Sequence, residues 1–161
     1  KKVIFVPDKN LARYVAAQLP EKEIIPFSGC CTVHDRMRTV DVDAALAAQP
    51  DALLLVHPEC PEEVTRRAHY VGSTAGILNY AHESDHDKFI IGTEMGILHV
   101  LKKQNPGKQF FLLSPRLFCT NMKKTHIEDL RDALLHEQYE ITLGKDTMEK
   151  ARVSLERMLA V

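Results

Sequence analysis

Short apolar runs alternate with amphipathic stretches along the chain. The run at 2–6 is rich in β-branched residues, and after a polar turn the stretch 11–19 places apolar side chains at helical spacing. The same order recurs further along the chain and predicts a parallel sheet covered by helices, with functional groups at the carboxyl ends of the strands. The expected strands and their helices are 2–6 with 11–19, 51–56 with 61–71, 88–92 with 97–104, and 139–143 with 147–159.

The sequence also repeats weakly at an offset of 86 residues. Cys31 falls two positions from the residue aligned with Cys119, so each repeat has a thiol after its second strand. Chance similarity between α/β units is the alternative explanation. A real repeat predicts two pseudo-symmetric α/β units, with approximate bounds 1–86 and 87–161. The aligned segments include Leu11 with Ile97, Pro20 with Pro106, Lys22 with Lys108, Ile24–Ile25 with Phe110–Phe111, and Leu53–Val56 with Tyr139–Thr142.

Composition narrows the class of protein. The 161 residues are 45% hydrophobic and 27% charged, which is enough to bury a core as one domain or two small ones. The formal net charge is −1 with both signs interspersed, which disfavours nucleic acid and anionic membranes and favours small-molecule partners. No apolar run could span a bilayer and no secretory signal is evident, so we expect a cytoplasmic location.

The cysteines Cys30, Cys31, Cys60 and Cys119 favour metal ligation or burial over disulfides in a reducing compartment. Cys31 and Cys119 are too far apart for a compact zinc site, so a shared metal would be held by distant loops. Iron–sulfur clusters bind cysteine thiolates, and a cubane with three protein thiolates leaves one iron open as a Lewis acid. The third thiolate would come from Cys60 or from chain upstream of residue 1.

Six sequence blocks resemble quinolinate synthase, the iron–sulfur enzyme of NAD biosynthesis, in order and spacing over essentially the whole chain. The blocks are VPDKNLARYVA, GCCTVHDR, HPEC, GSTAGIL, GTEMGILHVLKK and CTNMKK. The resemblance implies three similar three-layer α/β/α domains with short parallel sheets around one [4Fe-4S] cluster, with one cysteine per domain. It also implies that this chain is the C-terminal part of such a protein, inactive alone, with the third cluster cysteine upstream of residue 1.

The resemblance assigns cluster ligation to Cys31 and Cys119, for which a buried structural cysteine is the alternative. Cys60 is left out of the cluster, because the HPEC motif varies to serine at this position within the family. Cys30 is expected to fill space beside the cluster ligand Cys31 without binding the cluster. Lys123 would balance thiolate or substrate charge, or lie solvated.

The polar residues after the run 53–56 take their roles from the same resemblance. His34, His57 and Glu59 would face the substrate, with Glu59 as general acid and base and the histidines orienting oxygens or shuttling protons. A histidine satisfied within the core is the alternative. Ser73 and Thr74 would cap a helix and bind a substrate carboxylate or phosphate. Capping also accounts for Asp8, Asn10, Thr93 and Glu94.

The implied reaction condenses iminoaspartate with dihydroxyacetone phosphate to give quinolinate, phosphate and water. L-aspartate oxidase would supply the iminoaspartate. Two other classes stay open: a non-catalytic α/β module that binds a dicarboxylate, and a zinc hydrolase built on His34, His57 and Glu59.

Overall fold

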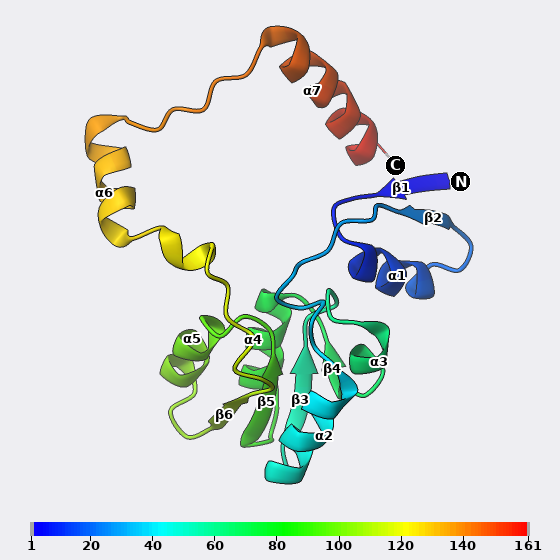
Figure 1. Ribbon diagram of the computed structural model, residues 1–161, viewed down its shortest axis with the longest axis vertical. Helices are drawn as coiled ribbons and strands as arrows, with labels where there is room; N and C mark the ends of the chain where they lie inside the picture. The colour runs from blue at the N-terminus through cyan, green and yellow to red at the C-terminus, as the bar shows by residue number, and fades with distance from the viewer. Residues whose placement is uncertain (1, 161) are drawn as a thin grey trace. The chain divides into compact units, whose positions relative to one another are not determined.

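The computed structural model describes residues 2–160, which form two compact units: one ends at Cys119 and the other begins at Thr120. The first unit contains β1 (Lys2–Phe5), α1 (Lys9–Gln18), β2 (Glu23–Pro26), α2 (Thr39–Ala48), β3 (Leu53–Val56), α3 (Glu62–Thr65), β4 (Tyr70–Val71), α4 (Thr74–Glu83), β5 (Lys88–Gly92), α5 (Ile97–Gln104) and β6 (Gln109–Leu112) (Figure 1). The second unit contains a 3₁₀ helix (Met122–Lys124), α6 (Ile127–His136) and α7 (Lys145–Leu159).

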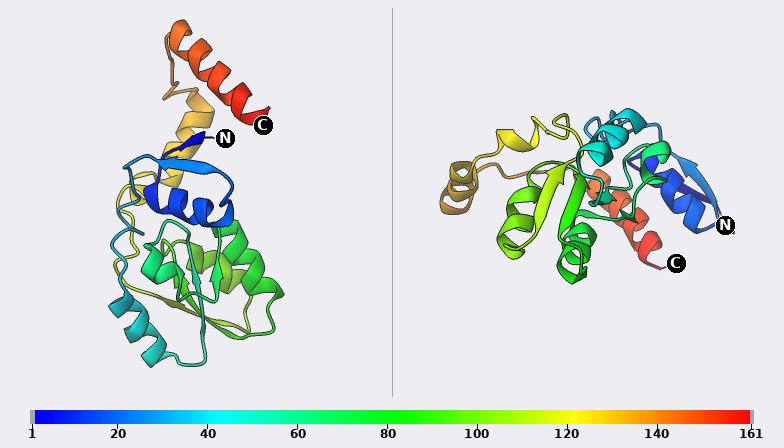
Figure 2. Two further views of the ribbon diagram at one scale, coloured as in Figure 1. Left: turned by 90° about the vertical axis from the view of Figure 1, so that its right-hand side faces the viewer. Right: turned by 90° about the horizontal axis from the view of Figure 1, so that it is seen from below.

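A parallel sheet with the strand order β4-β3-β5-β6 forms the centre of the first unit. Side chains alternate between its faces. Leu55 and Ile91 pack with residues of α4 and α5, whereas Leu54 and Ile90 pack with residues of α2 and α3. Helices therefore cover both faces (Figures 1 and 2), which confirms the expected α/β class with short parallel sheets. The expected boundary between 86 and 87 falls inside this sheet, because β3 and β4 precede it while β5 and β6 follow it.

The segments β1-α1-β2 and β5-α5-β6 are two versions of one unit. Each pairs its two strands in parallel and in the same register, with Lys2 opposite Glu23 and Lys88 opposite Gln109. We call residues 2–27 the first copy and residues 88–113 the second copy; corresponding positions are 86 residues apart. The repeat seen in the sequence is confirmed over these residues.

Two expected elements differ from the structure. The helix expected at 61–71 stops at Thr65, because the chain turns back to add β4 to the sheet: the His69 N–H donates to the Leu54 carbonyl (2.8 Å). The strand expected at 139–143 is wrong, and the match of Leu53–Val56 with Tyr139–Thr142 fails with it. Positive φ angles at Glu137 (49°) and Tyr139 (68°) interrupt an extended chain there.

The second unit confirms the helix expected at 147–159, which runs from Lys145 to Leu159 as α7. Helix α6 starts with the Asp129 carboxylate accepting the His126 N–H at 2.8 Å. Among the described residues, no helix combines the length and the apolar character needed to cross a membrane.

Candidate functional site

Three loops of the candidate site follow neighbouring parallel strands. β3 ends at Val56, opposite Val71 of β4 and Gly92 of β5, so the residues after these strands emerge at one edge of the sheet. The His57 N–H continues the ladder by donating to the Gly92 carbonyl (3.1 Å). Carboxyl ends of parallel strands are where α/β proteins gather functional groups. The HPEC, GST and GTE turns therefore lie at the same edge of the sheet, where the strands end.

His34 links two of these loops. Its Nδ1 lies 3.0 Å from Glu59 Oε2 and its Nε2 lies 3.0 Å from Thr93 Oγ1, and the residue is only 7% exposed. A neutral imidazole has one donor and one acceptor nitrogen. With an ionised Glu59, Nδ1–H donates to the carboxylate and Nε2 accepts the Thr93 hydroxyl proton. Glu59 is thereby held in one orientation by a buried ring.

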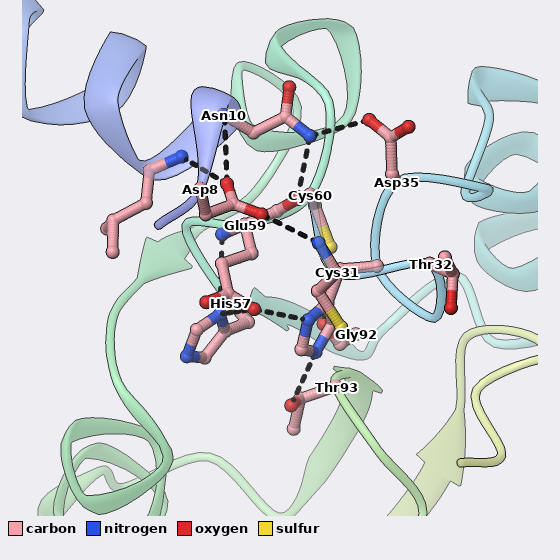
Figure 3. A network of polar contacts seen from close by, with 12 residues as sticks. Asp8, Asn10, Cys31, Thr32, Asp35, His57, Glu59, Cys60, Gly92 and Thr93 are labelled. Atoms are coloured by element: carbon pink, nitrogen blue, oxygen red, sulfur yellow. Dashed lines mark hydrogen bonds and ion pairs between the residues drawn. The ribbon is translucent and has the colours of Figure 1, made fainter. Parts of the chain in front are cut away.

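His57 stacks on His34, with ring centroids 4.6 Å apart and an interplanar angle of 11°. Its Nδ1 accepts the Glu59 N–H (3.3 Å) and lies 3.7 Å from Glu59 Oε2 (Figure 3). Burial lowers the pKa of His57, and the neighbouring His34 lowers it further. A neutral His57 agrees with the acceptor role of Nδ1 and leaves the proton on Nε2.

Cys31 completes a cluster of three different ligand types. One ligand atom each from Cys31, His34 and Glu59 lie within 4.8 Å of one another. Cys60 lies close by but is 1% exposed, and its Sγ–H donates to the Gly92 carbonyl (3.5 Å). Burial raises the pKa of the Cys60 thiol to about 12, which disfavours a free thiolate at this position.

The hydrogen bonds that support the site were only partly expected from the sequence. Asp8 is the N-cap of α1, as expected, but Asn10 is not a cap. The Asn10 amide donates to Asp35 Oδ1 (2.7 Å) and to the Glu59 carbonyl (3.0 Å), so it fastens the HPEC turn (Figure 3). The Asn10 hydrogen bond also lowers the pKa of Asp35. The sequence feature that could have indicated this role of Asn10 is the VPDKN turn, because it follows a strand as the HPEC turn does.

The other expected site residues belong to the starts of α4 and α5 and to the 3₁₀ helix. Ser73 caps α4 by accepting the Gly76 N–H (3.1 Å), while its role and that of Thr74 in binding an anion stay predictions. Glu94 is 8% exposed and accepts the Gly96 N–H (2.7 Å), although Gly96 is the N-cap of α5. Lys123 is exposed in the 3₁₀ helix.

Comparison with known proteins identifies the family. The model of the family described as "Quinolinate synthetase A protein" matches residues 1–160. The chain belongs to the quinolinate synthase family. It is 53% identical over 160 residues to the quinolinate synthase of Alkaliphilus metalliredigens, 51% to that of Clostridium kluyveri and 50% to that of Methanoregula boonei. Each alignment covers 99% of this chain but 53% of the relative, so the chain spans about half the length of these quinolinate synthases.

The two cysteines that the quinolinate synthase resemblance selects are available as ligands. Cys31 and Cys119 are free thiols, half-buried, and both pack against the core cluster that contains Leu54, Val56 and Ile90. They lie in loops that follow β2 and β6, the second strands of the two copies. Soft thiolates from separate loops suit an iron–sulfur group, so the donor set fits the cofactor that the sequence predicts.

Proposed function

We propose that this chain is part of a quinolinate synthase that serves NAD biosynthesis. The reaction condenses iminoaspartate with dihydroxyacetone phosphate and releases quinolinate, phosphate and water. Membership of the family and the convergence of Cys31, His34 and Glu59 at one sheet edge support this proposal. The convergence carries most weight, because the loop of Cys31 and His34 and the HPEC turn of Glu59 are separate in the sequence and meet only in the folded chain.

In this proposal Cys31 and Cys119 supply two thiolates to a [4Fe-4S] cluster. A third thiolate comes from another part of the full-length protein, and Cys60 stays protonated. Held by Cys31 and Cys119, such a cluster would supply Lewis-acid chemistry toward a substrate oxygen. The fit of two free, half-buried thiols on separate loops supports this assignment.

Glu59, His34 and His57 carry the proton transfers and orient the substrate. Glu59 is the general acid and base. Its carboxylate is hydrogen-bonded to the ring of His34, and its backbone carbonyl accepts a hydrogen bond from the Asn10 amide, which supports its position. His57, kept neutral, offers Nε2–H to a substrate oxygen. Ser73 and Thr74, at the start of α4, bind a substrate carboxylate or phosphate with free N–H groups of the first turn.

The substrates suggest the surroundings in which the enzyme works. Iminoaspartate is supplied by L-aspartate oxidase in this proposal, and the location is cytoplasmic. Both parts of the proposal rest on the family and on the small-molecule character of the expected partners.

One observation favours a second candidate. A thiolate, an imidazole and a carboxylate lie within 4.8 Å of one another, and each is a type of ligand that zinc accepts. A zinc hydrolase is therefore the alternative, ahead of a non-catalytic module that binds a dicarboxylate. Its ligands would be Cys31, His34 and Glu59, whereas the sequence suggested His34, His57 and Glu59.

Anaerobic purification of the full-length protein separates these functions. The proposal expects iron and sulfide in equal amounts, a brown chromophore, and quinolinate formation. Cys31→Ser and Cys119→Ser should each lose the chromophore, whereas Cys30→Ser, at the exposed neighbouring position, should keep it. Glu59→Gln should keep the chromophore and lower kcat by about 10²–10⁴-fold. Bound zinc without iron or sulfide would favour the hydrolase, and a colourless protein that still binds dicarboxylates would favour the module.

A further inference from the structure

The loop that carries Cys31 is fastened to the turn after β1 by two hydrogen bonds. The Lys9 N–H donates to the Gly29 carbonyl at 2.8 Å. The Cys31 N–H donates to Asp8 Oδ2, also at 2.8 Å (Figure 3). The backbone is therefore held both at the cysteine and two residues before it.

The loop that carries Cys119 is fastened to the turn after β5 in the same way. The Met95 N–H donates to the Leu117 carbonyl at 2.9 Å, again two residues before the cysteine. The Cys119 N–H donates to Glu94 Oε1 at 3.4 Å, which is a longer and weaker contact than its counterpart. Asp8 and Glu94 occupy corresponding positions of the two copies, 86 residues apart.

These contacts persist although the two loops differ in length. The loop before Cys119 is two residues longer than the loop before Cys31, and the extra residues form a turn in which the Leu117 N–H donates to the Ser114 carbonyl (3.1 Å). The insertion lies before the fastened segment and leaves the pattern at the cysteine unchanged. Chance similarity of two helix starts would not preserve a contact to a loop of different length.

Helix capping alone does not explain a buried carboxylate at both positions. Asp8 is 2% exposed, and burying a carboxylate is costly unless it is well hydrogen-bonded. Its Oδ1 accepts the Asn10 and Leu11 N–H groups (2.8 Å each), which already caps the helix. A single oxygen is enough for a cap, as Ser73 shows at α4. The second carboxylate oxygen is needed to hold the cysteine.

Resting on the proposed cluster, we propose that Asp8 and Glu94 are equivalent positioning residues, each of which fixes the backbone of one cluster cysteine. A loop that is fixed before the metal arrives loses less conformational freedom on ligation. The two carboxylates thus preorganise both thiols and slow the loss of the cluster. Neither residue contacts the substrate in this role.

Asp8→Asn and Glu94→Gln test this role with little change in side-chain size. Each variant keeps one acceptor oxygen for the helix N–H groups, but turns an NH₂ donor toward the cysteine N–H. Asp129→Asn is the matched control, because Asp129 accepts a backbone N–H at 2.8 Å at the start of α6 and this N–H belongs to His126 instead of a cysteine. Thermal unfolding of all three variants measures any general loss of stability.

The first measurement is hydrogen exchange of ¹⁵N-labelled cysteine amides in the cluster-free, full-length protein. Asp8→Asn should speed exchange at Cys31 by about tenfold and leave Cys119 unchanged, since a net hydrogen bond of about 1.4 kcal/mol corresponds to a factor of ten. Glu94→Gln should act on Cys119 alone and by a smaller factor, given its longer contact. Asp129→Asn should change neither.

The second measurement is the rate at which a chelator removes the chromophore from the anaerobically loaded protein. Both variants should lose it severalfold faster than wild type and the control. Unchanged exchange at both cysteines would overturn the positioning role. If the amide exchange changes but the variants keep the cluster as long as wild type does, the carboxylates position the cysteines without stabilising the cluster. That result would overturn the link between positioning and the cluster and leave the proposed function intact. A wild-type protein without iron and sulfide would instead overturn the proposed function, and this inference with it.

Discussion

The two copies share a backbone plan but differ in burial. Ile90 of the second copy is fully buried, whereas Ile4 at the corresponding position of the first copy is 75% exposed. Phe89 and Val3 differ in the same direction, with 0% and 37% exposed. The strand pairs have the same register in both copies, so the pairing itself does not decide which residues form a core.

The neighbours of each copy account for the difference. In the second copy β5 also pairs with β3, and helices cover both faces of the resulting sheet. In the residues that the structure describes, β1 and β2 pair only with each other. Local sequence therefore sets the strand–helix–strand geometry, while contacts from outside the copy determine how much apolar surface it buries.

The largest expected effect comes from shortening the same isoleucine in each copy. Ile90→Ala should lower the free energy of unfolding of the 161-residue chain by roughly 2–5 kcal/mol, because a fully buried side chain leaves a cavity. Ile4→Ala should change it by no more than about 0.5 kcal/mol. Chemical denaturation of both variants measures the difference, and equal losses would contradict the contrast in burial.

A second test uses a strand position at which one copy has valine and the other has glycine. A methyl group at Gly92 would lie 2.6 Å from Val56 Cγ1, so Gly92→Ala should cost about 1–3 kcal/mol through overpacking. Val6, its counterpart, is 61% exposed, and Val6→Ala should cost less than about 0.5 kcal/mol.

The Val56→Ala background provides the control for the Gly92 prediction. It removes the clashing Cγ1, so adding Gly92→Ala should then cost much less than it does in wild type. Denaturation of the single and double variants measures this coupling. An unchanged cost in the double variant would show that the remaining neighbours, the Cβ of residue 56 (3.0 Å) and Leu113 Cδ2 (3.3 Å), exclude a side chain at Gly92.

Much of the fold follows from the sequence, because periodicity reports local structure. The segments 88–92 and 97–104 match β5 and α5 as expected, and the 86-residue repeat reflects real strand pairs. The failures depend on long-range contacts. Strand β4 forms only because its chain reaches β3, and the apolar segment at 139–143 finds no strand partner among the described residues.

The candidate site, like the fold, could be predicted from the sequence only in part. His57 and Glu59 stand out in the sequence because they follow a buried strand, and the family blocks select Cys31 and Cys119. The hydrogen bonds from Asn10 to the Glu59 carbonyl and from Cys31 to Asp8 could not be read from spacing. They join loops that only the folded sheet brings together.

The smallest expected effect lies at the outer edge of the strand pairs. Lys2 and Glu23 form an exposed ion pair (3.0 Å) across β1 and β2, whereas Lys88 faces Gln109 at the same place in the second copy. Glu23→Gln converts the first arrangement into the second and should cost at most about 1 kcal/mol, because exposed pairs are strongly solvated. Denaturation at low and high salt measures it, and the cost should vanish at high salt. A loss that persists in high salt would mean that Glu23 supports β1 and β2 by packing, and that this edge is less open than its exposure indicates.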